Sequence, residues 1–230
     1  MESKIILILG LLFFSFKFYA QKRENNSSKK NKNKLTGKEI VLELDKLNFF
    51  NLTEKKELKL TKEDFEKSYD ELSFFEGYMK DDLSFTDNRF YFIDSETLFE
   101  GGGLTGYLET IKPLFDKLNL KLSFSDEINN QTKEHWTYKI KLNGKEYTAF
   151  DNDFGDYDWG IAYLNFIEML NDQLKLQNSN EQFYPISSGN DGRIVLLTKE
   201  QFDFITLNYP NNNERPTTID NWKKELEFKK

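Results

Sequence analysis

An Asn-Gly pair, Asn143 and Gly144, constrains the fold of this chain more than any other feature. On either side, residues 136–142 and 146–150 alternate apolar and polar side chains, as half-buried strands do. Both residues of a two-residue hairpin turn need a positive φ, which Asn and Gly adopt readily. The pattern therefore predicts an antiparallel β-hairpin in the middle of the chain.

Four more segments are predicted to be strands. Residues 89–93 form a dense run of β-type side chains, and residues 120–124 alternate apolar and polar side chains. Residues 182–186 and 193–197 lie on either side of a polar turn, in which Asn and Asp tolerate left-handed backbone.

Apolar residues recur at helical spacing in five further segments. These segments are residues 36–48, 61–76, 104–118, 159–176 and 198–207. Thr36 and Thr61 are predicted to cap the first two helices, and Thr198 with Gln201 matches a capping box. Pro113 lies inside the third helix and predicts a kink or a later helix start.

Helices between hairpins, with few parallel crossovers, indicate an α+β fold: a mainly antiparallel sheet with packed helices and a helical N-terminal preface. We predict one domain over residues 35–230. Its preface covers residues 35–88, its sheet-containing core residues 89–207, and an irregular tail residues 208–230. The chain has no Cys, so stability must come from core burial, to which 22 Phe and 11 Tyr bring large apolar areas.

Residues 1–20 are predicted to be a signal peptide. Residues 5–16 form an almost unbroken apolar run, which fits a signal-peptide core of roughly 7–15 residues and is shorter than the about 20 that cross a membrane. Cleavage after Ala20 would deliver the protein to the periplasm or outside the cell. Phe18 stands where a small residue is preferred, and basic residues follow, so an uncleaved N-terminal membrane anchor is the alternative. Residues 21–34 are predicted to be a disordered basic linker.

The predicted domain is acidic. From Leu35 onward the chain carries 24 basic and 37 acidic side chains, a net charge of −13. Nucleic-acid binding is disfavoured, because it depends on Lys and Arg that neutralise phosphates. An acidic surface suits a cation or a basic protein partner. We therefore expect a protein partner, no nucleic acid, and no membrane span once the signal peptide is cleaved.

Four carboxylates within eight residues, Asp151, Asp153, Asp156 and Asp158, mark a candidate metal site between a predicted strand and a predicted helix. Clustered Asp side chains in a Gly-containing loop supply oxygen ligands of the kind that Ca²⁺ prefers. The spacing does not match an EF-hand loop, because Gly155 comes one position early and no Glu stands at the twelfth position. The alternatives are that Asp156 or Asp158 caps the helix, or that the carboxylates are catalytic.

Two polar, Gly-containing segments form a candidate binding surface. Residues 101–106 fit the pattern G-x-G-x-x-G, but residues 95–100 separate them from the preceding strand, unlike in a dinucleotide site. We expect a turn whose N–H groups open a helix and are able to bind an anion. The second segment is the turn that ends near residue 193. The candidate residues are Gly101, Gly102, Gly103, Asn190, Asp191 and Arg193.

His135 is the only histidine of the chain. A Ser-His-Asp or Cys-His nucleophile would require this residue, and the chain has no G-x-S-x-G motif. Zinc sites normally need several His or Cys ligands. We therefore predict no catalytic residue and no cofactor other than a candidate calcium ion, and we expect His135 at the surface, at the start of a strand.

Five short motifs within residues 36–207 resemble a group of small bacterial proteins. The motifs are residues 47–50 (LNFF), 99–103 (FEGGG), 159–160 (WG) before a helix, 184–193 (YPISSGNDGR) and 196–198 (LLT). The compact acidic α+β domain is also similar to immunity-type proteins of toxin–antitoxin competition systems. This resemblance implies protein binding and transfers no catalytic residues. Most immunity-type proteins are cytosolic, so a signal peptide implies a toxin that acts in the periplasm, or a different role.

These features predict an exported, non-catalytic binding module of immunity type, with an acidic surface for a protein partner. The alternative is a secreted carboxylate-dependent hydrolase assisted by calcium, because 37 acidic residues offer many carboxylate pairs. A third interpretation is a structural protein of the cell envelope, tethered by residues 21–34.

Overall fold

The computed structural model describes residues 35–70, 74, 87–100, 103–155, 157–186, 191–209 and 215–227. The predicted signal peptide and linker lie outside the described residues. The described residues belong to one compact unit, Leu35–Lys230. Its helices are α2 (Gly37–Lys46), the 3-10 helix η1 (Phe49–Leu52), α3 (Leu58–Asp70), α4 (Ser95–Glu100), α5 (Leu104–Lys117), α6 (Asp158–Leu176), α7 (Lys199–Asn208) and α8 (Ile219–Glu227). Its strands are β1 (Phe90–Asp94), β2 (Phe124–Gln131), β3 (His135–Leu142), β4 (Lys145–Asp153), β5 (Glu181–Ile186) and β6 (Asp191–Thr198).

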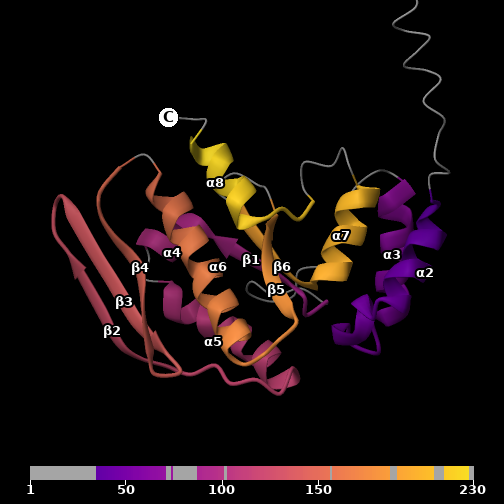
Figure 1. Ribbon diagram of the computed structural model, residues 1–230, viewed down its shortest axis with the longest axis horizontal. Coiled ribbons are helices and arrows are strands. Elements are labelled where there is room, and N and C mark those ends of the chain that lie inside the picture. The colour runs from indigo at the N-terminus through magenta and orange to yellow at the C-terminus, as the bar shows by residue number, and fades with distance from the viewer. Residues whose placement is uncertain are drawn as a thin grey trace, which may run out of the picture. The chain divides into compact units, whose positions relative to one another are not determined.

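The strands form two antiparallel sheets of three strands each, in the orders β1-β6-β5 and β2-β3-β4. Figure 1 shows α4, α5 and α6 between the two sheets, and α2, α3 and α7 on the other side of β5 and β6. Helix α6 contacts both sheets, through β4 and β5. The prediction of an α+β fold with antiparallel strands and packed helices is confirmed, with the strands divided between two sheets.

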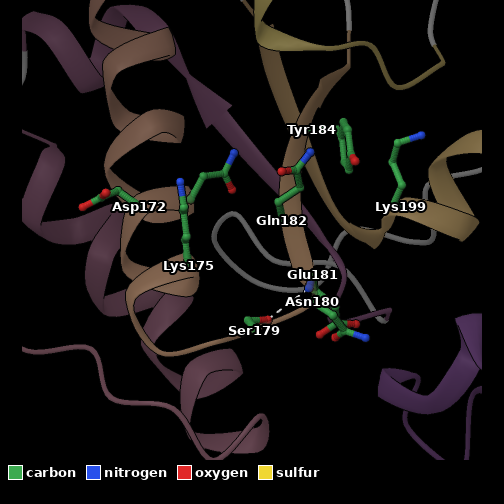
Figure 2. A pocket seen from close by; sticks show the side chains of 9 residues that line it. Asp172, Lys175, Ser179, Asn180, Glu181, Gln182, Tyr184 and Lys199 are labelled. Carbon is green, nitrogen blue, oxygen red and sulfur yellow. Dashed lines mark hydrogen bonds between the residues drawn. The ribbon is translucent and has the colours of Figure 1, made fainter.

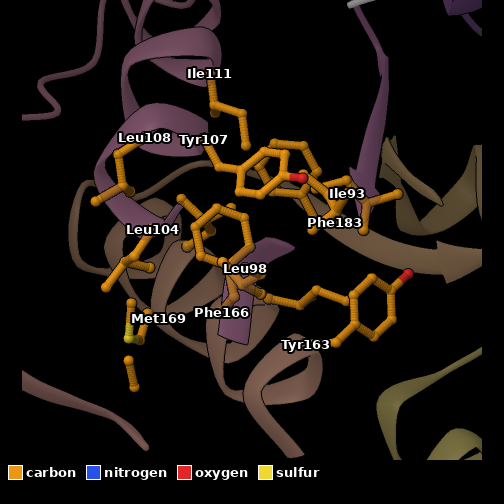
Figure 3. Close-up of a cluster of buried hydrophobic side chains, with 14 of the residues drawn as sticks. Ile93, Leu98, Leu104, Tyr107, Leu108, Ile111, Tyr163, Phe166, Met169 and Phe183 are labelled. Atoms are coloured by element: carbon orange, nitrogen blue, oxygen red, sulfur yellow. The ribbon is translucent and has the colours of Figure 1, made fainter. Parts of the chain in front are cut away.

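Both faces of the β1-β6-β5 sheet are buried, which explains the continuous apolar run in β6. Ile194 and Leu196 belong to one apolar cluster, and Val195 and Leu197 belong to another. The larger cluster joins this sheet to α5 and α6 (Figure 3). It also includes the inner face of the β2-β3-β4 sheet. The smaller cluster joins it to α2, α3 and α7. A strand covered on both faces needs apolar side chains at every position, not only at alternate ones.

Aromatic rings attach the helical preface to the sheet. Phe49 of η1 contacts Phe50 and Phe65 edge-to-face at ring-centroid distances of 5.2 Å. The same ring lies 6.3 Å from that of Phe90 in β1. All four side chains are buried. Edge-to-face pairs add to the stabilisation that burial alone provides, so the preface is part of the folded unit and not a separate module.

Local sequence signals predicted several turns and helix ends correctly. Asn143 and Gly144 connect β3 and β4 with φ angles of 48° and 84°. Thr36 caps α2, and Thr198 caps α7 in a capping box with Gln201. Each of these signals acts over three or four residues, so the tertiary structure has little opportunity to override it.

Three predicted elements differ from the structure. Thr61 does not cap α3, because the helix begins one turn earlier, at Leu58, and Thr61 is buried within it. The strand predicted at residues 120–124 is wrong, since β2 begins only at Phe124. Residues 125–131 are exposed on both sides of the sheet and carry no alternating pattern. The tail predicted to be irregular contains α8, whose apolar side packs on the larger cluster.

A fully buried arginine connects the preface to both β6 and β5. The guanidinium of Arg89 donates to the carbonyl oxygens of Phe49 and Leu196, at 2.5 and 2.9 Å, and to Oδ1 of Asn51. It also pairs with Glu181 at 2.9 Å, where the two side chains are 0% and 9% exposed. A buried charge is tolerated when it is paired and its hydrogen bonds are satisfied. Arg89 therefore fixes η1 against the strands.

We expect Arg89→Met to lower the free energy of unfolding by about 3–5 kcal/mol, because it leaves the carboxylate of Glu181 buried without its partner. Lys141→Met is the matched control. Lys141 pairs with Asp126 at 2.9 Å on the exposed surface, and such a pair contributes about 0–1 kcal/mol. Urea denaturation followed by tryptophan fluorescence measures both variants. Equal losses would show that Arg89 does not hold the preface in place.

Candidate functional site

The β2-β3-β4 sheet has one buried face and one exposed face. Along β3, Trp136, Tyr138, Ile140 and Leu142 are buried, and the residues between them are partly exposed. This alternation is typical of a strand with one face on the core. We call the exposed surface the open sheet face. Its side chains are Asp126, Ile128 and Asn130 of β2, His135, Thr137, Lys139 and Lys141 of β3, and Glu146, Thr148, Asp151 and Asp153 of β4.

A group of five polar side chains on this face is centred on His135. Its Nε2 lies 3.0 Å from Oδ1 of Asp151, and its Nδ1 lies 2.7 Å from Oδ1 of Asp153. Thr137 donates to Asp151 Oδ1 at 2.9 Å, and Lys139 Nζ lies 3.5 Å from Asp151 Oδ2. Strand pairing explains the grouping, because His135 lies opposite Asp153 and Thr137 lies opposite Asp151. We call this group the His135 cluster.

The His135 cluster is electrostatically coupled. The hydrogen bonds to Asp153 and Asp151 raise the pKa of His135, and the bond to His135 is the main cause that lowers the pKa of Asp151. When both ring nitrogens face carboxylates, the protonated ring, with two donors, satisfies both. The side chains of His135, Asp151 and Asp153 are 42%, 39% and 84% exposed, so solvent screens these interactions. The cluster therefore controls surface charge more than stability.

The structure separates the four predicted calcium ligands. Asp151 and Asp153 lie together beside His135, whereas Asp158 is buried at the start of α6 and accepts a hydrogen bond from the Gly155 N–H at 2.7 Å. The alternative in which Asp158 caps the helix is wrong, because Asp158 is the first residue of α6, the N-cap residue is Tyr157, and the Asp158 carboxylate bonds Gly155 outside the helix. Asp156 lies outside the described residues. Within the described ranges, no group of three or more His, Asp or Glu side chains is arranged to hold a metal ion.

The predicted Gly-rich binding surface is described only in part. The structure describes Gly103, Asp191 and Arg193, and Gly101, Gly102 and Asn190 lie outside it. The N–H of Gly103 donates to the carbonyl oxygen of Thr97 at 3.3 Å, so this group is already bonded and does not face an anion. Asp191 lies opposite Asp94 in the β1–β6 ladder, and Arg193 is the third residue of β6. The main chain of these three residues thus serves the fold.

The outer edge of β2 is open. Among the described residues β2 pairs only with β3, and residues 125–131 are exposed. The N–H of Thr132 donates to the carbonyl oxygen of His135 at 2.8 Å, so the main-chain groups of Thr132 face β3. This contact fixes which residues of β2 turn their main-chain groups towards β3 and which turn them away. In an antiparallel ladder every second residue turns its main-chain groups away from the partner strand. The N–H and C=O groups of Asn129 and Gln131 therefore point outward.

The corresponding edge of β5 is closed by side chains. The amide of Asn171 donates to the carbonyl oxygen of Phe183 at 2.9 Å and accepts from its N–H at 2.6 Å, as a neighbouring strand would. Ser179 Oγ accepts from the N–H of Glu181 at 3.1 Å, and Pro185 has no N–H. Blocked edges of this kind prevent strand addition, so the open edge of β2 stands in contrast.

A polar groove of about 400 Å³ lies between α6, β5 and the start of α7 (Figure 2). We call it the α6–β5 groove. It is lined by Asn171, Asp172, Lys175, Ser179, Asn180, Glu181, Gln182, Tyr184 and Lys199. Nothing in the sequence pointed to these residues, because they come from three elements and share no motif. Only the packing of α6 and α7 against β5 brings them together.

No protein-family model, no curated protein and no solved structure matches this chain. None of the helices in the described ranges combines the length and the apolar character that a membrane crossing requires.

The titration of His135 tests the His135 cluster. As the only histidine, it gives one titrating set of ring-proton NMR signals. We expect a pKa above the ordinary value of about 6.5, because Asp153 and Asp151 stabilise the protonated ring. With a raised folded-state pKa, the contribution of the cluster to stability is complete below the unfolded-state pKa and is lost as the pH rises through the folded-state value.

The double variant Asp151→Asn with Asp153→Asn removes both carboxylates that face the ring, so it should return the His135 pKa towards about 6.5. Asp116→Asn, which removes an exposed acid from α5, should leave it unchanged. A His135 pKa at or below the ordinary value in the unmodified protein would contradict the geometry of the cluster.

Proposed function

We propose that this protein is a non-catalytic binding module of immunity type, which engages a basic protein partner through the open sheet face and the adjoining edge of β2. The proposal rests on one observation: a single sheet combines an exposed, charged face with a strand edge that pairs with no other strand in the described ranges. The apolar run within residues 1–20 supports export, so the partner is met in the periplasm or outside the cell.

The charge of the open sheet face supports a basic partner. Four carboxylates lie on it against two lysines, and His135 adds a positive charge only when it is protonated. The domain as a whole has the same sign, with 24 basic and 37 acidic residues from Leu35 onward. A field of one sign steers an oppositely charged protein to the surface and raises its association rate.

The open edge of β2 supports strand addition as the binding mode. An added strand gains affinity from main-chain hydrogen bonds and specificity from alternate side chains. Here the outward groups of Asn129 and Gln131 would supply the hydrogen bonds. Ile128, which is 50% exposed beside the charged residues, would supply an apolar contact. The edge of β2 thus offers a strand or extended loop of the partner main-chain groups for hydrogen bonds, and the open sheet face offers it a surface of opposite charge.

The geometry gives less support to a carboxylate-dependent hydrolase. Such a mechanism needs one carboxyl group that stays protonated next to the substrate. The pKa of Asp151 is instead lowered by His135. Burial raises the pKa of Asp87, but this side chain is fully buried and accepts hydrogen bonds from Thr53 Oγ1 and the Arg89 N–H, at 3.0 and 3.1 Å. It is therefore not exposed to a substrate.

We expect Asp151→Asn with Asp153→Asn to weaken binding of the basic partner by up to about tenfold, since an exposed charge pair contributes up to ~1 kcal/mol. Binding of the unmodified protein should also fall as salt rises. To find the partner, cationic proteins of the host's periplasmic extract are captured on the immobilised protein and identified. The purified partner is then titrated against the unmodified protein and each variant to measure the dissociation constant. Asp116→Asn should bind as the unmodified protein does. Salt-insensitive binding, or equal weakening in all variants, would contradict the acidic face.

Strand addition predicts that Gln131→Pro weakens the same complex about five- to tenfold, because the variant loses an outward N–H worth ~1 kcal/mol. Gln131→Ala is the control, since it removes the side chain and keeps the N–H. Thermal melts of both variants should be similar, because the outward N–H bonds no other described residue. If both variants bind the purified partner equally well, the face binds without the edge.

A further inference from the structure

We propose that the α6–β5 groove binds a small organic anion that carries two or more carboxylate groups. Its volume of about 400 Å³ is within the range of sites for small molecules. The groove shares no residue with the open sheet face, so its ligand is independent of the proposed protein partner. Four features of the groove support the assignment: rigid walls, neutralised acids, two exposed lysines of which one has no partner among the described residues, and the separation of those lysines.

The walls of the groove are fixed by hydrogen bonds and stacking. Asn171 joins α6 to β5 through two hydrogen bonds with the main chain of Phe183. Tyr184 of β5 stacks on Phe202 of α7, with ring centroids 4.0 Å apart and planes at 10°. These contacts hold all three elements in place. A preformed site loses little conformational entropy when a ligand binds.

The acids of the groove already have cationic partners. Asp172 accepts from Lys145 Nζ at 2.6 Å and from the Tyr147 hydroxyl, and the bond to Lys145 is the main cause that lowers its pKa. Glu181 pairs with the buried Arg89 at 2.9 Å. Neither carboxylate therefore attracts a metal ion or a basic ligand into the groove.

The ammonium groups of the two groove lysines are available to a ligand. Lys175 lowers the pKa of Asp172 only through space, and its ammonium group makes no hydrogen bond or ion pair with any described residue. Lys199 pairs with Asp203 at 2.5 Å, but the two side chains are 70% and 56% exposed, so the pair is weak and can yield to a ligand.

The charges in and around the groove balance. Arg89, Lys145, Lys175 and Lys199 stand against Asp172, Glu181, Asp203 and Glu200, of which the last two act through space on Tyr184. The domain as a whole carries 24 basic and 37 acidic residues from Leu35 onward, so the groove is less negative than the domain average. An anion is therefore repelled less in this groove than elsewhere on the domain.

The arrangement of the cations selects for more than one carboxylate. In Figure 2, Lys175 extends from α6 and Lys199 from α7 on opposite sides of β5, with Gln182 and Tyr184 between them. An anion needs more than one charged group to contact both ammonium groups, and the Gln182 amide can donate between them. A sugar is a poor fit, because Tyr184 is buried against Phe202 and offers no ring face for stacking.

Citrate is the probe that tests the groove. Titration at constant ionic strength, followed by ¹H–¹⁵N NMR, should give saturable shifts at Lys175, Gln182 and Lys199, with a dissociation constant of about 1 mM. Acetate, which has one carboxylate, should bind at least about tenfold more weakly, and so should inorganic phosphate, whose oxygens all surround a single atom. Non-saturable shifts, or phosphate binding as tight as that of citrate, would overturn the assignment.

The variants Lys175→Gln and Lys199→Gln should each weaken citrate binding about fivefold, because each removes one charge-assisted contact. Both side chains are exposed, so folding is retained. Lys38→Gln, at an exposed lysine of α2, is the control and should bind normally. Asp151→Asn with Asp153→Asn should leave citrate binding intact, which separates failure of the groove from failure of the open sheet face. Unchanged binding in both groove variants would refute the proposal.

Discussion

The buried guanidinium of Arg89 is the interaction on which the arrangement of the folded unit depends. One side chain donates to η1, to β6 and to Glu181 of β5. A lysine carries its three donors on a single nitrogen, whereas the planar guanidinium spreads five donors over three nitrogens and so reaches acceptors on separate elements. The same contact holds Glu181 beside the α6–β5 groove. The preface, the sheet and the groove therefore share one electrostatic anchor.

The sheet edges show a division of roles. Asn171 closes β5 at Phe183, and the Tyr107 hydroxyl accepts from the Asp94 N–H at the end of β1 at 3.0 Å. The edge of β2 has no such cover among the described residues. It is instead protected by exposed acids and by an irregularity at Asp126, whose φ is 52°. Two β2 edges would repel each other, because like charges oppose pairing, so the charge of this edge opposes its pairing with a second copy.

Local signals were readable from the sequence, and long-range contacts were not. The turn at Asn143 and the cap at Thr36 depend on neighbouring residues, so the sequence predicted both. The pattern around Arg89 predicts only the start of a strand, because the partners of its guanidinium lie about 40 and 100 residues away. The groove lysines, Lys175 and Lys199, gave no signal for the same reason. Burial and charge pairing arise from packing, which periodicity does not encode.

The His135 cluster shows how one inserted residue changes the chemistry of a surface. The Asn143-Gly144 turn pairs Leu142 with Lys145, and in an unbroken register Asp151 would lie opposite Trp136, on the buried face. A bulge between the Tyr138 and Lys139 pairs shifts the register by one, so that Asp151 lies opposite Thr137 instead. A shift of one residue moves every later side chain to the other face. The bulge therefore keeps the carboxylates of Asp151 and Asp153 out of the buried core. It places them beside His135, where they contribute to the charge of the open sheet face.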